Sequence, residues 1–428
     1  MRSSLFISFF LFLSGLYSQN LDSVFENATS LNREKRKLEM ENTISSEIKS
    51  FQTKKNESVF KKSLEYMQIL NFVDEEVQKT FKIILNEYQI KSESFLSQLL
   101  ETIYTISPIE FQNEMQRIAK ETNNPKHFAI AIHYLLRLNP EERKNYSDLL
   151  KQKFKNIEKN PILKILSTYL EKSPFEYLSK RPPILDLLRH NYGEDTFVVF
   201  SFQRANRDYP GLAIIKKKDG SFLRREDGSI FTISQLAKSM SDLPSYITNG
   251  NTPQGIFSIQ KIQSVKNDLI GPTPALITAL PFEIASDVYF QEVRSKSWDM
   301  QMYLDILPSS WQSYFPMKEA YYAGEIGRNG IYAHGTTLDS NFYKGSLFFP
   351  NSPTRGCLSA KEIWSRKNGK RLYSDQIVLI ETVRKLSTSK GYMIVVDLNE
   401  ESKPVSLDDI LMDVLEAEES PMNESNRN

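Results

Sequence analysis

The residues with the clearest potential for chemistry lie in one stretch of the C-terminal half. Cys357 is the only cysteine of the 428-residue chain, and His334 is the only one of its four histidines beyond position 190. A thiol with a pKa of about 8.5 is mostly protonated at neutral pH, so a nucleophilic cysteine needs a group that favours the thiolate. A nearby imidazole can take the thiol proton. The two residues therefore predict a cysteine nucleophile with a histidine base.

Three neighbouring features are expected to favour the thiolate of Cys357. Ser359 and Glu362 have the spacing of a capping box, which predicts a helix whose positive N-terminus lies next to the sulfur. Arg355 adds a permanent positive charge two positions before the cysteine. Gly356 lets a substrate carbonyl approach the backbone, where the N–H groups of Gly356 and Cys357 hold the oxyanion. This pattern predicts nucleophilic attack on a carbonyl group.

Structural roles are the alternative for these residues. A lone cysteine is most often a small buried apolar residue, and a lone histidine is usually structural. We interpret His127, His133 and His190 as structural, because they lie in helical or apolar surroundings. His334 differs because a glycine follows it and the cysteine lies downstream in the same half. Both interpretations of the Cys357 and His334 pair stay open from the residues alone.

Residues 1–18 have the layout of a secretory signal peptide. A positive start precedes the apolar run LFISFFLFL at 5–13, and small or polar residues follow it. The run is shorter than the roughly 20 residues that span a bilayer as a helix, although an uncleaved membrane anchor is the alternative. We therefore expect an exported protein of the periplasm or cell envelope. An unpaired thiol in that compartment is a candidate reactive group.

The composition argues against several classes of function. The chain has 54 Lys and Arg against 53 Asp and Glu, which gives no general reason to expect nucleic acid or an anionic membrane as partner. One cysteine excludes an intramolecular disulfide framework and a thiolate zinc cluster. Four separated histidines leave little for a metal site. We expect no metal and no other cofactor.

The chain divides into a helical part and a β-rich part, so the predicted fold class is α+β. Residues 19–189 are predicted to form an all-helical domain of unknown role, because 21–185 contain no glycine and are rich in Leu, Ile, Lys and Glu. Residues 190–400 are predicted to form a β-rich domain with short helices. A last helix from Ser406 and a polar tail are predicted within 401–428.

Individual elements follow from local patterns. Asn-Pro at 139 and 160 and Ser-Pro at 173 place a capping residue before a first-turn proline, and each pair predicts a helix start. Asp-Gly pairs at 219 and 227 predict hairpin turns. A mostly apolar helix is predicted at 128–138. Strands are predicted at four apolar runs, 196–202, 211–215, 377–383 and 392–398.

Three pieces of the region from about 205 to 385 resemble the catalytic domain of L,D-transpeptidases (YkuD-type), enzymes that cross-link bacterial peptidoglycan. NTPQGIFSI at 251–259 is similar to the family's Thr-Pro-x-Gly-x-Phe strand entry. IYAHG at 331–335 is similar to its first His-Gly element, and SPTRGCLS at 352–359 to its Ser/Thr-His-Gly-Cys element. The resemblance implies that 190–400 is an L,D-transpeptidase-like catalytic domain, and it does not cover the helical part.

The chain departs from the family pattern near the cysteine. Arg355 stands where the family has His, and Ser359 stands where it has Arg or Asn. The 22 residues between His334 and Cys357 are more than is common in the family. Aromatic residues in this interval form either a lid over the substrate or a loop that packs down, and packing is the simpler interpretation: Phe342, Tyr343, Phe348 and Phe349.

The resemblance implies a mechanism and a set of site residues. Cys357 attacks the third residue of a tetrapeptide stem, His334 transfers the proton, and a side-chain amine of a neighbouring stem takes the acyl group from the thioester. No metal or organic cofactor is implied, and carbapenems acylate the cysteine. Gly335 orients the histidine through its carbonyl, and Gly356 contributes to the oxyanion site. The implied substrate-binding residues are Arg355, Thr354, Tyr332 and Ser359.

Two alternatives stay open from the sequence. If water captures the thioester instead of an amine, the protein is an L,D-carboxypeptidase or amidase. The substitutions at Arg355 and Ser359 motivate a second alternative, a non-catalytic peptidoglycan-binding protein whose helical domain docks other envelope proteins. The expected partners in every case are peptidoglycan stem peptides, with no nucleic acid.

Overall fold

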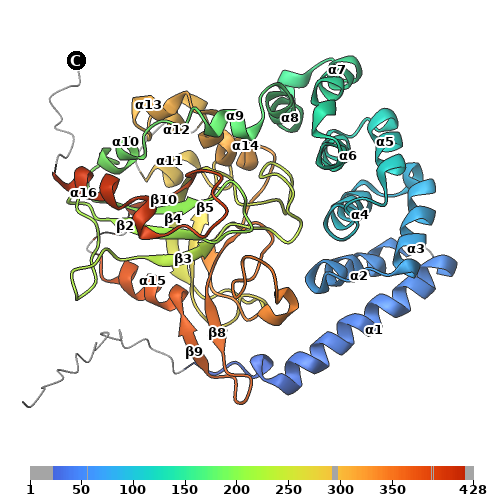
Figure 1. The fold of residues 1–428 in the computed structure, drawn as a ribbon, viewed down its shortest axis with the longest axis horizontal. Helices are drawn as coiled ribbons and strands as arrows, with labels where there is room; N and C mark the ends of the chain where they lie inside the picture. The colour runs from blue at the N-terminus through green and yellow to red at the C-terminus, as the bar shows by residue number, and fades with distance from the viewer. Residues whose placement is uncertain (1–22, 55, 292–296, 387, 389, 420–428) are drawn as a thin grey trace, which may run out of the picture.

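An arc of helices and an eight-stranded barrel make up the described part of the chain (Figure 1). This computed structural model describes residues 23–54, 56–291, 297–386, 388 and 390–419. The predicted signal peptide at 1–18 and the end of the polar tail therefore lie outside the described residues. The fold is mixed helix and strand, with the helical region first in sequence, as predicted.

The arc consists of ten helices that follow one another from the N-terminal end of the described chain (Figure 1). Asn160 and Ser173 cap α8 and α9 as predicted, whereas Asn139 makes no capping bond and is followed by a short 3-10 turn. The arc is made of α1 (Ser30–Lys54), α2 (Glu57–Leu70), α3 (Glu75–Asn86), α4 (Glu93–Ile106), α5 (Gln112–Glu121), α6 (Pro125–Leu138), α7 (Arg143–Lys153), α8 (Pro161–Glu171), α9 (Pro174–Leu178) and α10 (Ile184–Arg189).

The barrel closes in the order β1-β10-β4-β5-β6-β7-β3-β2. The β1–β10 and β6–β7 pairs are parallel, and the other pairs are antiparallel. A separate hairpin pairs β8 (Glu362–Trp364) with β9 (Arg371–Ser374). The barrel strands are β1 (Thr196–Gln203), β2 (Gly211–Lys216), β3 (Ile233–Leu236), β4 (Gly255–Gln263), β5 (Ala275–Ala279), β6 (Ala333–His334), β7 (Leu358–Ala360) and β10 (Lys390–Asp397).

Three of the four predicted strands are confirmed, and the run at 377–383 is a correction. It belongs to α15 (Asp375–Arg384), which Ser374 caps by accepting a hydrogen bond from the N–H of Ile377. A continuous apolar run does not by itself distinguish a buried strand from a buried helix. The burial of α15 on almost all sides explains why its sequence lacks a clear helical period.

Short helices complete the β-rich part. The predicted last helix is confirmed, because Ser406 starts a 3-10 turn at Leu407–Asp409 that leads into α16 (Leu411–Glu419). The remaining helices are α11 (Ser286–Phe290), α12 (Met300–Leu304), α13 (Ser309–Gln312) and α14 (Glu319–Glu325).

The barrel strands are buried on both faces, because the arc and the short helices cover the outside. Along β1, Phe197 and Val199 pack in a cluster with α15, whereas Val198 and Phe200 belong to the larger cluster that continues into the helices of the arc. This explains why β1 reads as an apolar run instead of an alternating pattern. The arc and the barrel thus share one core.

Polar contacts also hold the arc against the loops of the barrel. Arg33 pairs with Asp339 at 2.9 Å, and Nε2 of His133 lies 2.5 Å from the hydroxyl of Tyr246. In the interval before the cysteine, Tyr343 is buried and donates from its hydroxyl to the carbonyl of Ile69 at 3.2 Å. The aromatic loop therefore packs against the arc, in agreement with the simpler of the two interpretations.

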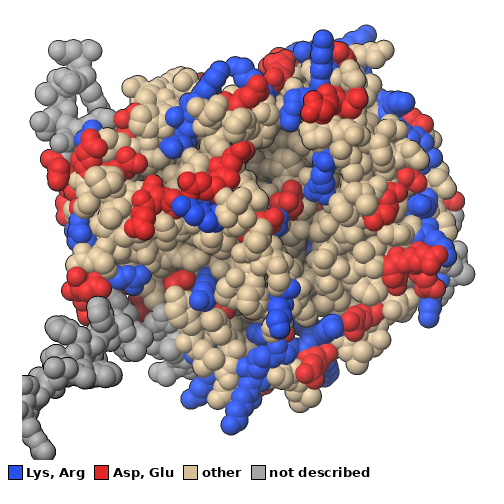
Figure 2. Space-filling view, viewed as in Figure 1, with Lys and Arg blue, Asp and Glu red and all other residues tan. Residues whose placement is uncertain are grey.

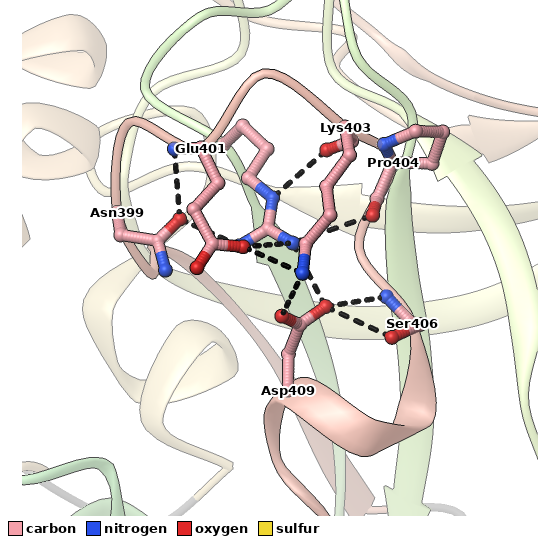
Figure 3. A network of polar contacts seen from close by, with 7 residues as sticks. Asn399, Glu401, Lys403, Pro404, Ser406 and Asp409 are labelled. Carbon is pink, nitrogen blue, oxygen red and sulfur yellow. Dashed lines mark hydrogen bonds and ion pairs between the residues drawn. The ribbon is translucent and has the colours of Figure 1, made fainter.

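A buried arginine fixes the C-terminal segment to the end of β1 (Figure 3). Arg204 is fully buried and donates to the side chains of Asn399 at 2.6 Å and Asp409 at 2.8 Å. Its Nε also donates to the carbonyl of Lys403 at 3.0 Å. Asp409 in turn accepts from the N–H of Ser406 at 2.8 Å, so the arginine and the start of the last helix share one carboxylate.

Candidate functional site

The two motif pieces that contain the histidine and the cysteine lie on neighbouring parallel strands. Ala333 of β6 pairs with Leu358 of β7, and His334 pairs with Ser359. The N–H of Leu358 also donates to the carbonyl of Tyr332 at 2.9 Å. This register brings Cys357 beside Tyr332 and two positions from His334, although the two motif pieces are far apart in the sequence.

The thiol of Cys357 contacts two backbone groups of the segment that leads into β6. Its Sγ accepts from the N–H of Tyr332 at 3.4 Å and donates to the carbonyl of Gly330 at 3.3 Å. Burial raises the pKa of the thiol to about 11, and the N–H of Tyr332 and the positive charge of Arg328 lower it in part. The thiol is therefore protonated at neutral pH until a base removes its proton.

His334 is held as the neutral tautomer that a base requires. The side chain is buried, and its Nδ1 lies 2.5 Å from the carbonyl oxygen of Gly335. Because a carbonyl only accepts, Nδ1 carries the proton and Nε2 keeps a free lone pair. Burial lowers the pKa of His334, which also favours the neutral ring. Within the described residues, no hydrogen bond joins this ring to Cys357.

The predicted capping box beside the cysteine is wrong. Leu358–Ala360 is strand β7, and Ser359 pairs with His334 on one side and with Leu236 on the other. The hydroxyl of Ser359 donates to the carbonyl of Ser352 at 2.7 Å and caps no helix. Pairing within the barrel satisfies the backbone that a helix would have used, so tertiary structure overrides the local signal. The helix N-terminus expected next to the sulfur is therefore replaced by strand β7.

The cation that acts on the thiol is Arg328 and not Arg355. The Arg355 side chain is half exposed and pairs with Glu65 of α2 at 2.8 Å. Arg328 is buried and donates to the carbonyls of Gly250 at 2.9 Å and Asn251 at 3.0 Å. Sequence analysis missed Arg328, because nothing in its neighbourhood distinguishes it from other loop arginines.

Gly356 is required by the backbone and by Arg328. Its φ is +106°, and a Cβ at this position would overlap Nη2 of Arg328 and lie 2.6 Å from the carbonyl of Gly250. The N–H of Gly356, expected to hold an oxyanion, instead donates to the hydroxyl of Thr354 at 3.0 Å. The N–H of Cys357 donates to no group in the described part of the chain, and it is the donor left for an oxyanion.

Two threonines hold the backbone of the cysteine loop. Thr354 donates from its hydroxyl to the carbonyl of Cys357 at 2.9 Å, so its side chain is used within the loop. Thr252, from the Thr-Pro piece, donates to the carbonyl of Gly356 at 3.0 Å. The third motif piece therefore contributes by positioning the cysteine. Of the other predicted substrate-binding residues, Tyr332 is partly exposed and contacts the thiol through its backbone.

A buried carboxylate lies directly against the His-Gly element. A Cβ on Gly335 would overlap Oε2 of Glu362 and lie 2.6 Å from its carboxyl carbon. Glu362 accepts from the hydroxyls of Thr273 at 2.5 Å and Ser374 at 2.6 Å. Burial raises its pKa to about 7. Sequence analysis assigned Glu362 to a helix cap, whereas in the structure it supports the backbone that orients His334.

Two cavities lie between the arc and the barrel near this site. One, of about 670 Å³, is bordered by α2, α4, α6 and Arg355. The other, of about 400 Å³, is bordered by Thr252 and by the buried acids Glu319 and Asp397. Cys357 does not line either cavity. The described residues contain no group of three or more His, Cys, Asp or Glu side chains placed to hold a metal ion.

No protein-family model, curated protein or solved structure matches this chain. Among the helices of the described residues, none combines the length and the apolar character that crossing a bilayer requires.

Proposed function

We propose that this protein is a cysteine-dependent L,D-transpeptidase that joins peptidoglycan stem peptides outside the cytoplasm through a thioester on Cys357. The observation that carries the proposal is the Nδ1 contact of His334 with the carbonyl of Gly335, on the strand parallel to that of the cysteine. This contact leaves Nε2 of His334 free to act as a base. In the register of β6 and β7, Cys357 lies opposite Tyr332, two residues before His334. The sequence resemblance supplies the reaction class.

In the first half-reaction, the donor is a stem tetrapeptide. Nε2 of His334 removes the proton from Sγ, and the sulfur attacks the carbonyl carbon of the third residue. The N–H of Cys357 stabilises the oxyanion, since it has no partner among the described residues. The amide bond to the terminal D-alanine breaks, and His334 returns the proton to the departing amine. A thioester with the tripeptide remains.

In the second half-reaction, a side-chain amine of a neighbouring stem attacks the thioester. The new amide bond forms, the C–S bond breaks, and the proton that the amine loses restores the thiol through His334. The cross-link joins the third residues of two stems. The thioester conserves enough reactivity for this transfer, so the reaction requires no metal, organic cofactor or nucleotide. Capture by water gives L,D-carboxypeptidase action from the same intermediate.

One observation favours a second candidate, a non-catalytic peptidoglycan-binding protein. The thiol is only partly exposed, it donates to the carbonyl of Gly330, and desolvation raises its pKa to about 11, all of which disfavour a resting thiolate. In this candidate the helical arc is the working part and docks envelope proteins. The rate at which iodoacetamide alkylates Cys357 at pH 7.5 separates the candidates. An enzyme requires a faster reaction than that of a thiol in the urea-unfolded chain, compared at the same pH.

Purified sacculi test the transpeptidase proposal itself. The protein is incubated with sacculi, muropeptides are released by a muramidase, and the products are compared with those from Cys357→Ala. An increase in cross-linked dimers that depends on Cys357 supports transfer. Trimmed monomers without dimers identify the hydrolase. An unchanged muropeptide profile contradicts both enzymatic forms and leaves the binding protein.

A further inference from the structure

A large cavity lies where the helical arc meets the loop of the cysteine. Its volume is about 670 Å³, within the range of small-ligand and peptide sites. The arc borders it with α2, α4 and the start of α6, and the barrel borders it with Thr248, Asn249 and Arg355. Figure 2 shows the surface hollowed along this seam between the arc and the barrel. The resemblance to transpeptidases does not cover the arc, so this cavity is a feature of this chain.

The cavity carries an excess of positive charge. Lys61, Lys62 and Lys126 line it, and none of the three forms an ion pair with a carboxylate among the described residues. Nζ of Lys61 lies 2.8 Å from the hydroxyl of Ser94, and Nζ of Lys62 lies 5.3 Å from the centre of the Tyr66 ring. Unpaired lysines facing one cavity favour a ligand with carboxylate groups.

The acidic residues of the same cavity are already used or buried. Glu65 pairs with Arg355 at 2.8 Å. Glu101 is buried and accepts from the side-chain amide of Asn249 at 3.2 Å, and burial raises its pKa, which favours the uncharged form. The third acid of the lining is Glu93, the first residue of α4. With the Arg355–Glu65 pair set aside, three lysines face Glu93 and the buried Glu101, so the positive charges of the lining still exceed its negative charges.

Two helix N-termini add to this charge. Glu93 and Ser94 begin α4, and Lys126 is the second residue of α6. Each helix has 14 residues, and the N-terminus of a helix carries partial positive charge. Lys126 itself is partly buried, and burial lowers its pKa although the nearby Glu101 raises it in part, so a further anionic partner would favour its charged form.

The cavity is joined to the cysteine loop through its barrel side. Arg355 stands two positions before Cys357, and Asn249 precedes Gly250, whose carbonyl accepts from Arg328 beside the thiol. Cys357 itself does not line the cavity. A peptide held there contacts the cysteine loop at Arg355 without covering the sulfur, which suits the acyl acceptor and not the acyl donor.

We propose that this cavity binds the acceptor stem peptide by its carboxylate groups, with Lys126, Lys62 and Arg355 as the recognition residues. The identification of the occupant as the acceptor rests on the proposed transpeptidase function. The chemistry recognised is that of a short peptide with more than one carboxylate. The arc thus contributes a substrate site that the catalytic barrel lacks.

Equilibrium binding tests this proposal without turnover. The probe is the soluble tetrapeptide L-Ala-γ-D-Glu-meso-diaminopimelate-D-Ala, titrated by calorimetry into the full chain with Cys357→Ala. Lys126→Met is expected to weaken binding by at least about tenfold, through loss of a charge-assisted contact. Lys120→Met, on the exposed surface of α5, removes the same charge and is expected to leave binding unchanged. The same tetrapeptide with amidated carboxylates is expected to bind the protein with intact Lys126 at least as weakly as the unmodified tetrapeptide binds Lys126→Met.

The outcomes separate this site from the proposed activity. If Lys126→Met and Lys120→Met bind the tetrapeptide equally, the cavity is not the site, even when the protein with its cysteine intact forms dimers from sacculi. Equal binding of the amidated peptide contradicts recognition by carboxylates. If binding depends on Lys126 but no Cys357-dependent product forms, the cavity is a peptide site and the catalytic proposal alone fails.

Discussion

A buried guanidinium occupies the space that a side chain on the motif glycine would need. Nη2 of Arg328 lies against the backbone of Gly356, which has a φ of +106°. The same arginine donates to the carbonyls of Gly250 and Asn251. The glycine before the cysteine is thus required first by the packing of a cation beneath the site, and this cation is the one that lowers the pKa of the thiol.

We predict that Gly356→Ala destabilises the protein by more than about 3 kcal/mol, because left-handed backbone and overlap with Arg328 add together. Gly345→Ala is the matched control. Gly345 has a φ of +96° with nothing within 4 Å of a Cβ, so only the backbone cost of about 1 kcal/mol applies. Urea unfolding followed by circular dichroism measures both. Equal losses for the two variants would show that the Arg328 contact is unimportant.

We predict that Arg328→Lys and Arg355→Met affect the thiol differently. Arg328 lowers the pKa of Cys357, so a lysine that cannot reach the same carbonyls leaves the thiol harder to ionise. Arg355 pairs with Glu65 and its loss leaves the thiol unchanged. The rate at which iodoacetamide alkylates Cys357, measured in both variants and the wild type from pH 7 to pH 10, compares how readily the thiol ionises. If Arg355→Met slows alkylation and Arg328→Lys does not, the cation that acts on the thiol is Arg355 and the prediction is wrong.

We predict that Glu362 makes the stability of the folded protein depend on pH. Burial raises the pKa of this carboxyl from 4.5 to about 7, so the folded state binds the proton more tightly than the unfolded state. Its contribution is fully present below pH 4.5 and is lost as the pH rises through about 7. Unfolding free energies of the wild type and Glu362→Gln at several pH values measure this.

The difference in unfolding free energy between the wild type and Glu362→Gln should shift by about 3 kcal/mol across this range, in favour of the variant at high pH. The wild type and the variant share every other titrating group, so these cancel in the comparison. A difference that stays constant with pH would mean that the carboxyl titrates normally in the folded protein.

We predict that Arg204→Leu loosens the C-terminal segment. The arginine is fully buried between Asn399 and Asp409, and its removal leaves a carboxylate without its main partner, at a cost of about 3 kcal/mol or more. Arg224→Leu is the control, because its pair with Glu418 also reaches this segment but is partly exposed and contributes at most about 1 kcal/mol. The midpoint of thermal unfolding and the rate of limited proteolysis near α16 are measured for both variants. Similar losses would contradict the role of the buried network.

The sequence predicted a helical part before a β-rich part and three of the eight barrel strands, because those signals are local. The absence of glycine marks the helical arc, and the runs at 196–202 and 392–398 have the β-branched and aromatic residues of strands. The strand predicted at 377–383 was wrong, since a helix buried on almost all sides shows the same continuous apolar pattern as a strand.

At the candidate site, the sequence could single out residues by type but could not place them in space. Cys357 and His334 were singled out by type, and the structure places them two positions apart across β6 and β7. The capping box at Ser359 failed because barrel pairing takes the backbone that a helix would use. The role of Arg328 and the contact of Arg355 with Glu65 depend on segments far apart in the chain, which no local pattern specifies.

The central claim is that Cys357 forms an acyl-enzyme with His334 as its base, and intact-mass spectrometry of a trapped intermediate tests it most directly. The full chain is mixed with a soluble stem tetrapeptide or with a carbapenem, quenched in acid and weighed. We predict a mass increase equal to the tripeptide acyl group or to the intact carbapenem, absent in Cys357→Ala and formed at least about 100-fold more slowly in His334→Gln. An unmodified protein with both reagents, or an adduct that persists in Cys357→Ala, would contradict the account.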